Sequence, residues 1–304
     1  MTTARRILWW LGFGWMAWRL LGPEIEPRFR GPQERPIRVP GRSVFVGDIE
    51  LFVRQAGDPG SPPLVLVHGW GFDGEMTFYR VIEPLAEDFR VIVPDHRDHG
   101  KSDWVRGPLT VERMADDLAG VLDAIGVETF AMFGYSLGGM VAQELVRRHP
   151  GRVTKLVLGA TAAWPVYRRR PLARAAFWVG RALARVSRNE FAAISRRLMA
   201  RTGALLPEHE RWMHAALLRR DPTLHYEIGR AAWLFDSRLW IESLGVDTMV
   251  IVPTDDFVVS PTVQRQLASL VGGDRVVELT GAGHESIMTR SDDYVKQIKA
   301  FLLE

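Results

Sequence analysis

A serine stands between two glycines in the segment Gly134 to Gly138, which reads Gly-Tyr-Ser-Leu-Gly and follows the apolar run Phe130 to Phe133. Apolar residues at helical spacing then continue to His149, where Pro-Gly ends the pattern. The segment therefore predicts a strand, a sharp turn at Ser136 and a helix. Small neighbours let a serine hydroxyl stand clear of such a strained turn, so Ser136 is our candidate nucleophile.

Two further side chains could complete this chemistry. The predicted strand Thr248 to Val252 is followed by Asp255 and Asp256, and the predicted strand Val276 to Leu279 is followed by His284 on a loop of small residues. Neighbouring side chains on an extended loop point in opposite directions, so only one of the two carboxylates can face the histidine. We expect His284 to be a base and Asp256 to be its acid, with Asp255 as the alternative.

These residue types suit nucleophilic catalysis. A serine hydroxyl must lose its proton as it attacks a carbonyl carbon, and an imidazole can take that proton and later give it to the leaving group. A buried carboxylate holds the imidazole in the required tautomer and stabilises its cation. The three residue types therefore predict hydrolysis through an acyl-serine intermediate.

From about Ser43 to Glu304 the chain resembles the α/β-hydrolase superfamily, in which serine, acid and histidine follow one another in this order. The resemblance implies a mostly parallel sheet with helices on both faces and an inserted helical lid. It also favours Asp256, because the acid in relatives lies three residues past the position that Pro253 fills here. The implied activity is that of an esterase or a lipase.

A second part of the resemblance is the tetrapeptide His-Gly-Trp-Gly that begins at His68. In relatives, one backbone N–H of the oxyanion hole comes from the residue after the His-Gly pair, and the other from the residue after the nucleophile. By position these residues are Trp70 and Leu137. We expect His68 to brace this loop rather than act as a base, with Gly69 and Tyr135 as further neighbours of the site.

The segment Asp95 to Ser102 resembles the D-x-R-G-x-G-x-S loop of the family, with Asp98 where glycine is usual. We expect His96, His99 and Glu285 to be solvated loop residues, with the alternative that they lie near the pocket and support the catalytic groups. No cluster of histidines and carboxylates has metal-ligand spacing, and no glycine-rich phosphate loop follows a first strand. We therefore expect neither a metal nor another cofactor.

Strand and helix patterns alternate along most of the chain, which predicts a parallel sheet covered on both faces. The stretch 161–244 interrupts this alternation with helical segments rich in tryptophan and arginine, and we assign it as the lid. The catalytic core then comprises residues 43–160 and 245–304. Further elements are expected as strands at 43–46, 50–55, 64–67, 90–93 and 154–158, and as helices near 76–87 and 111–125.

The amino-acid composition limits which kinds of site and partner the protein can have. The 304 residues are 47% hydrophobic and include no cysteine, which excludes a disulfide framework and a thiol nucleophile. Residues 161–240 contain 15 arginines, no lysine and 6 acidic residues, which leaves +9 on this stretch although the whole chain carries only +3. Such a surface could meet anionic lipid or a fatty-acyl substrate, or it could pair with carboxylates of the core. No nucleic-acid-binding motif accompanies the charge.

The N-terminus has its own pattern. Residues 1–22 are rich in tryptophan, and their uncharged run Ile7 to Trp18 is shorter than the roughly 20 residues that span a bilayer. Tryptophan favours the membrane interface, so we predict a peripheral membrane helix over residues 5–21, followed by a linker over 23–42. The alternative is that this helix packs on the lid.

Together these patterns predict a serine carboxylic-ester hydrolase for a small lipophilic acyl ester. Within the same superfamily, the alternatives are cleavage of thioesters, lactones or carbon-carbon bonds, and a receptor that binds a small ligand without turnover. We expect a cytoplasmic or peripherally membrane-associated protein that does not bind nucleic acid, with secretion left open.

Overall fold

The computed structural model describes residues 28–105, 107, 109–164, 178–179, 188–219, 222–272 and 274–304. The predicted N-terminal helix, the first residues of the predicted linker and parts of the predicted lid lie outside these ranges. Within them, no helix is both long enough and apolar enough to cross a bilayer.

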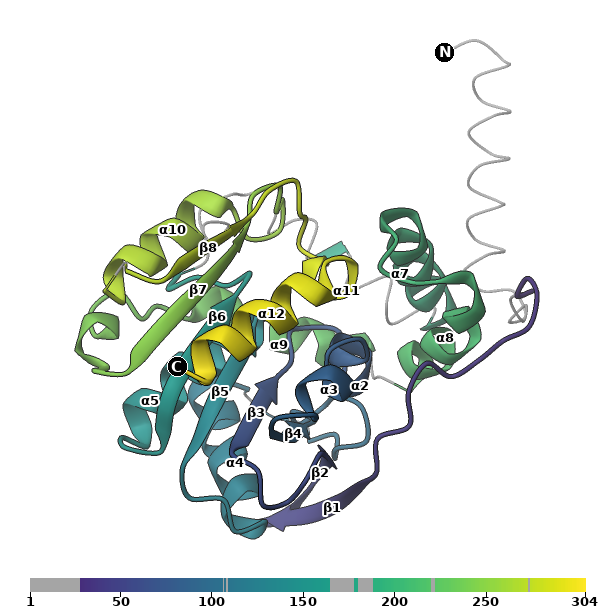
Figure 1. Ribbon diagram of the computed structural model, residues 1–304. Coiled ribbons are helices and arrows are strands. Elements are labelled where there is room, and N and C mark those ends of the chain that lie inside the picture. Colours follow the sequence, from purple (N-terminus) through teal and green to yellow (C-terminus); the bar gives the residue numbers. More distant parts are fainter. Residues whose placement is uncertain are drawn as a thin grey trace.

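An eight-stranded sheet forms the centre of the molecule, with strand order β1-β2-β4-β3-β5-β6-β7-β8 (Figure 1). The first two strands pair in an antiparallel hairpin at one edge, and the second is also antiparallel to β4, whereas all other neighbours are parallel. The strands are β1 Gly41–Val46, β2 Ile49–Ala56, β3 Pro63–Val67, β4 Arg90–Pro94, β5 Phe130–Tyr135, β6 Val153–Gly159, β7 Asp247–Pro253 and β8 Val276–Leu279.

Helices cover both faces of the sheet, because its central strands are apolar on both sides. One buried cluster joins the sheet to α4 (Val111–Ala124), α5 (Leu137–Arg148) and α10 (Pro261–Leu270). The other joins the opposite face to α2 (Gly74–Phe78), α3 (Ile82–Leu85) and α12 (Ser291–Leu302), with the short α11 (Ser286–Thr289) before the last of these. The expected α/β-hydrolase architecture is therefore present.

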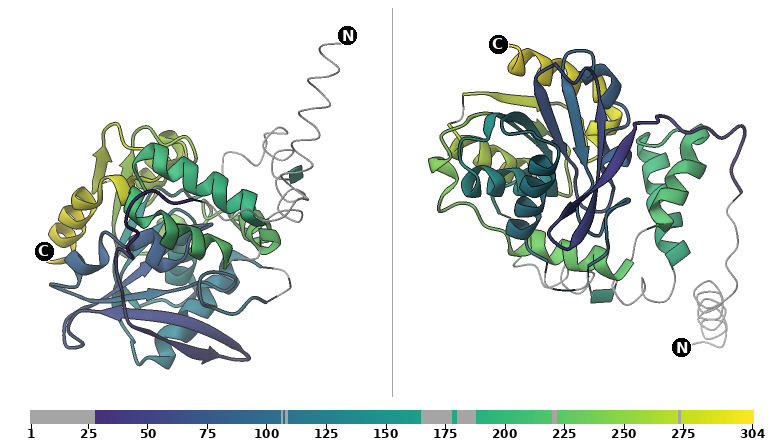
Figure 2. Two further views of the ribbon diagram at one scale, coloured as in Figure 1. Left: turned by 90° about the vertical axis from the view of Figure 1, so that its right-hand side faces the viewer. Right: turned by 90° about the horizontal axis from the view of Figure 1, so that it is seen from below.

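Residues 161–244, which we call the insertion, separate β6 from β7. Their described elements are α7 (Arg188–Thr202), η2 (Pro207–His209), α8 (Glu210–Leu218), α9 (Pro222–Leu234) and η3 (Ile241–Ser243). The views of Figure 2 place α7 and α8 to one side of the sheet and its covering helices. The chain that precedes β1 passes along η2 and α8, and the Glu34 N–H donates to the Glu208 carbonyl oxygen of η2 over 2.7 Å.

Among the elements expected within the described ranges, all but one helix agree with the observed elements to within two residues at either end. The exception is the single helix expected near 76–87, which is divided into α2 and α3. Pro84 explains the break, because proline in a helix interior lacks an N–H and clashes with the preceding turn. In the observed arrangement Pro84 lies in the first turn of α3, where no intrahelical donor is required.

Candidate active site

Ser136 lies at the turn from β5 into α5 and has a φ angle of 55°, in the left-handed region that non-glycine residues rarely adopt. Its neighbours must be glycine: a Cβ on Gly138 would come within 2.0 Å of the Val67 carbonyl oxygen, and one on Gly134 within 2.6 Å of the Gly138 carbonyl oxygen. The Thr161 hydroxyl donates to the Ser136 carbonyl oxygen over 2.7 Å. Close packing thus holds the strained turn in place.

Three side chains from distant parts of the chain meet at this turn. The Ser136 Oγ lies 3.0 Å from the His284 Nε2, and the His284 Nδ1 lies 2.8 Å from the Asp256 Oδ2. A carboxylate can only accept, so the histidine donates from Nδ1 and leaves Nε2 to accept the serine proton. These three residues follow β5, β7 and β8, whose carboxyl ends meet at one edge of the parallel sheet.

The two candidate carboxylates lie in different surroundings. The Asp256 side chain is fully buried, and its Oδ1 accepts the N–H groups of Val258 and Val259, each over 2.8 Å. Its Oδ2 also accepts the side-chain amide of Gln264 over 3.1 Å. Asp255 is exposed instead. The structure therefore brings Asp256, and not its neighbour, to the histidine.

Tyr135 contacts the backbone of the histidine. Its hydroxyl donates to the His284 carbonyl oxygen, and the Ile287 N–H lies within 3.5 Å of the same hydroxyl. Complete burial raises the pKa of Tyr135 above its ordinary value, so the phenol stays protonated and able to donate. Tyr135 thus fixes the backbone from which the imidazole projects.

The oxyanion-loop candidates follow β3. A Cβ on Gly69 would lie 3.1 Å from the Ser136 Cβ and 3.3 Å from the Tyr135 carbonyl oxygen, which is a tight contact, so glycine lets this backbone pass close to the serine. Trp70 is the next residue and lines the same cavity as Ser136. Leu137 is the first residue of α5, where a helix leaves its N–H groups without intrahelical partners.

His68 is completely buried beneath this loop. Its Nε2 accepts the His96 N–H over 3.0 Å, and its Nδ1–H donates to the Gly69 carbonyl oxygen over 2.9 Å. Burial, together with the neighbouring His96 and His99, lowers the pKa of His68 well below the usual range. These contacts are those of a neutral residue that braces the loop.

The expectation that His96 and His99 are solvated is wrong, because both are buried, with 6% and 1% of their surface exposed. Their rings form a cluster with His68, at centroid distances of 4.3 and 4.9 Å. Burial lowers the pKa of His96 to about 3. Asp98 adopts the left-handed conformation of the usual glycine, with φ 63°, and its carboxylate accepts the Val105 N–H over 2.6 Å.

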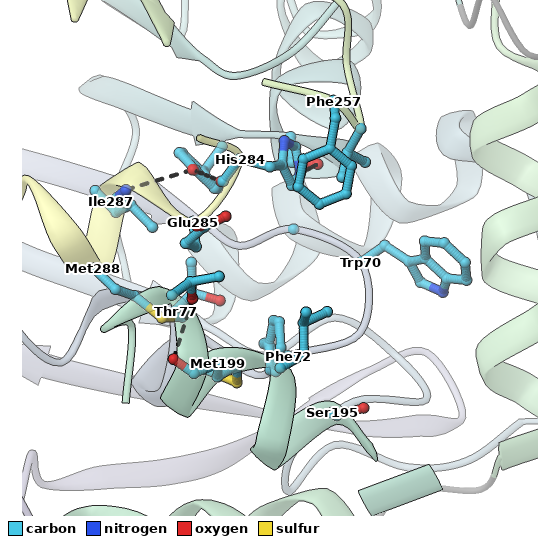
Figure 3. Close-up of a pocket in the computed structure, with 16 residues that line it drawn as sticks. Trp70, Phe72, Thr77, Ser195, Met199, Phe257, His284, Glu285, Ile287 and Met288 are labelled. Carbon is cyan, nitrogen blue, oxygen red and sulfur yellow. Dashed lines mark hydrogen bonds between the residues drawn. The ribbon is translucent and has the colours of Figure 1, made fainter. Parts of the chain in front are cut away.

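Ser136 and His284 open onto a cavity of about 230 Å³ (Figure 3). Its wall is mainly apolar, and among the described residues no lysine or arginine lines it. Glu285, expected on a solvated loop, is part of this wall. The other lining residues are Gly69, Trp70, Phe72, Thr77, Tyr135, Ser195, Leu198, Met199, Thr202, Phe257, Val258, Ile287 and Met288.

Sequence reasoning missed several supporting groups. Gln264 bonds Asp256 from α10, and Thr161 bonds the Ser136 carbonyl from the start of the insertion. No local pattern distinguishes these polar residues from others on a helix or loop, because their role depends on contacts between distant segments. Within the described ranges, no group of histidines and carboxylates is arranged to hold a metal ion.

One known protein resembles this chain over most of its length, and another resembles part of it. A protein of Azorhizobium caulinodans named for carbamate hydrolysis is 28% identical over 265 residues, which are 84% of this chain and 96% of that protein. The pimeloyl-[acyl-carrier protein] methyl ester esterase of Chromobacterium violaceum is 39% identical over 114 residues, 38% of this chain and 42% of the esterase.

Solved structures of hydrolytic enzymes also superpose on this chain. A hydrolase from Pseudomonas aeruginosa superposes with a TM-score of 0.75 at 26% identity, covering 86% of this chain and 98% of that one. The enol-lactonase from Burkholderia xenovorans superposes with a TM-score of 0.71 at 26% identity, covering 86% of this chain and all of the lactonase. The family model described as the alpha/beta hydrolase fold matches residues 62–291, and the chain therefore belongs to the α/β-hydrolase family of hydrolytic enzymes.

Proposed function

We propose that this protein is a serine carboxylic-ester hydrolase for a lipophilic acyl ester. The observation that carries the proposal is the continuous contact from Asp256 through His284 to Ser136, which ends at the wall of an apolar cavity. A nucleophile, a base and an orienting acid within hydrogen-bond reach are the parts that acyl transfer requires.

In the proposed reaction, His284 Nε2 takes the hydroxyl proton as Ser136 Oγ attacks the ester carbonyl. The backbone N–H groups of Trp70 and Leu137 then stabilise the negative oxygen, each by about 3 to 4 kcal/mol. Collapse of the tetrahedral intermediate expels the alcohol, which takes its proton from His284. Water, activated by the same imidazole, then hydrolyses the acyl-serine.

The cavity wall supports an uncharged, largely apolar acyl group. Glu285 is a lining residue, and no cationic side chain of the described chain is available there to offset a substrate carboxylate. The relatives described above include a protein named for carbamate hydrolysis and a lactonase, so carbamates and lactones are alternative substrate classes. Cleavage of thioesters or carbon-carbon bonds is a further alternative within the family.

The experiment is a panel of 4-nitrophenyl esters of increasing chain length, run beside an aliphatic lactone and an aryl carbamate. We expect an optimum chain length among the esters, and a fall of about 10⁴- to 10⁶-fold in kcat for Ser136→Ala. Thermal unfolding of the variant is the control for folding. Rapid turnover by Ser136→Ala would refute the assignment of Ser136 as the nucleophile. Slow single turnover by the wild-type protein would favour a ligand receptor.

We also propose that the rim of the cavity meets a lipid surface. Leu198 and Phe257 line the cavity and yet are 53% and 68% exposed, and half-exposed apolar side chains at a cavity mouth suit an interfacial substrate. The predicted membrane helix, residues 5–21, lies outside the described residues. Deletion of this segment, compared with substitutions at the rim, measures what each contributes to lipid binding.

A further inference from the structure

One polar side chain of the cavity is unlike the others. Thr77 belongs to α2, is only 2% exposed and lines the cavity, and its Oγ1 has no hydrogen-bond partner among the residues that the structure describes. Its backbone N–H is satisfied, because it donates to the Asp73 carbonyl oxygen over 3.0 Å. The hydroxyl is thus the part of this residue that is left for a ligand.

A buried hydroxyl without a partner destabilises the protein, whereas valine has nearly the same shape and carries no such cost. Other hydroxyls of this wall have protein partners: those of Tyr135 and Ser136 bond to His284, and Thr202 Oγ1 donates to the Met199 carbonyl oxygen over 3.1 Å. In the view of Figure 3, Thr77 is drawn on the same side of the cavity as Met199 and Met288, with Trp70 on the opposite side. Thr77 therefore adds one polar group to an apolar part of the wall.

We propose that the Thr77 hydroxyl donates a hydrogen bond to an oxygen atom inside the acyl chain of the substrate, an inference that rests on the proposed esterase function. An uncharged ether, keto or hydroxyl oxygen fits, because Glu285 lines the same cavity and would repel a carboxylate. The substrate class is thus a neutral acyl ester with an internal oxygen, and Thr77 determines its specificity. Thr77 takes no part in the bond-making steps.

The test uses pairs of 4-nitrophenyl esters that differ by one atom, octanoate and its analogues with one CH₂ replaced by an ether oxygen at successive positions. The readout is the ratio of kcat/KM for the ether ester to that for octanoate, since a loss common to both esters cancels. At the favoured position we expect Thr77→Val to lower this ratio roughly 5- to 10-fold.

Two variants serve as controls. Thr77→Ser keeps the hydroxyl and should keep the positional preference. Thr202→Val removes a hydroxyl that already has a protein partner, and should leave the ratio as in the wild type. If Thr77→Val leaves the ratio unchanged at every position, the hydroxyl is not bound by substrate and the inference fails, while the esterase proposal stands on the turnover of the esters themselves.

A binding measurement separates the two proposals if turnover is absent. The same ester pairs are titrated calorimetrically into Ser136→Ala and into Ser136→Ala combined with Thr77→Val. The expected result is again a roughly 5- to 10-fold loss of preference for the ether ester in the second protein. Equal preference in the two proteins, or a lower unfolding temperature for Thr77→Val alone, would show that the hydroxyl serves the fold or binds only water.

Discussion

The catalytic side of the cavity and its insertion side are held in different ways. On the catalytic side, buried hydrogen bonds join residues from four parts of the chain, and Ser136 and its glycines admit almost no change. On the insertion side, buried apolar residues of α7 and α8, such as Met199 and Met213, pack on the core, and exposed contacts such as Gln33 Nε2 to the Pro207 carbonyl oxygen over 3.1 Å add the segment before β1. Directional hydrogen bonds at the edge of the sheet therefore position the reacting groups, whereas apolar packing is the main contact that holds the insertion.

Charge differs between the two sides as well. Inside the insertion, Arg196 pairs with Glu210, and Arg238 with Asp236, whereas Arg219 comes within 4.0 Å of Asp73 of the core. The excess arginine of this segment is therefore partly offset within the segment itself.

The largest expected effect lies on the catalytic side. Asp256→Asn should keep the fold but lower kcat about 10³- to 10⁴-fold, because the amide no longer holds His284 in the tautomer that accepts the serine proton. The matched control is Asp255→Asn, an exposed neighbour, whose kcat should stay close to wild type. Similar losses in both variants would remove the distinction between the two carboxylates.

The sequence allowed the strand-turn-helix at Ser136, the order of the strands along the chain and the position of His284 to be predicted, because each has a local signature. The choice between the two aspartates required the resemblance to known enzymes. The prediction that His96 and His99 are solvated was wrong. Their burial depends on how the loop after β4 packs against the loop after β3, and a local sequence pattern does not contain this information. Local patterns predict elements, and contacts between distant loops decide their surroundings.

The buried histidines predict a pH effect on the stability of the core. The native pKa of His96 is about 3, below the value of about 6.5 in an unfolded chain, so the unfolded state binds more protons at acid pH. Stability should therefore be full above pH 6.5 and fall between pH 6.5 and 3, with a loss of about 2 kcal/mol at pH 5 from this one residue. Urea unfolding at pH 7 and pH 5 measures it, and His96→Gln should reduce the difference. An equal difference in the variant would contradict the assignment.

Arg35 tests how the segment before β1 is fixed to the core. Its guanidinium bonds both carboxylate oxygens of Glu75 over 2.7 Å, and the Glu75 side chain is buried. Because Arg35 itself is 37% exposed, Arg35→Ala should cost about 1 to 2 kcal/mol rather than the larger loss typical of a fully buried pair. Chemical unfolding gives this number. Gln33→Ala, which removes only exposed contacts, is the control and should change stability by less than about 0.5 kcal/mol.

The smallest effect concerns lipid contact at the rim of the cavity. Leu198→Ser with Phe257→Ser removes two exposed apolar side chains of the cavity rim, and deletion of residues 1–22 removes the predicted membrane helix. If both contact lipid, each change should weaken partition onto anionic vesicles several-fold, since each apolar side chain contributes by burying its surface in the headgroup region. Hydrolysis of a short water-soluble ester should be retained by the deletion variant, because the described site uses no residue before 28. Partition that survives the deletion but not the rim changes would place the lipid contact at the cavity, and partition that survives both would remove the membrane proposal.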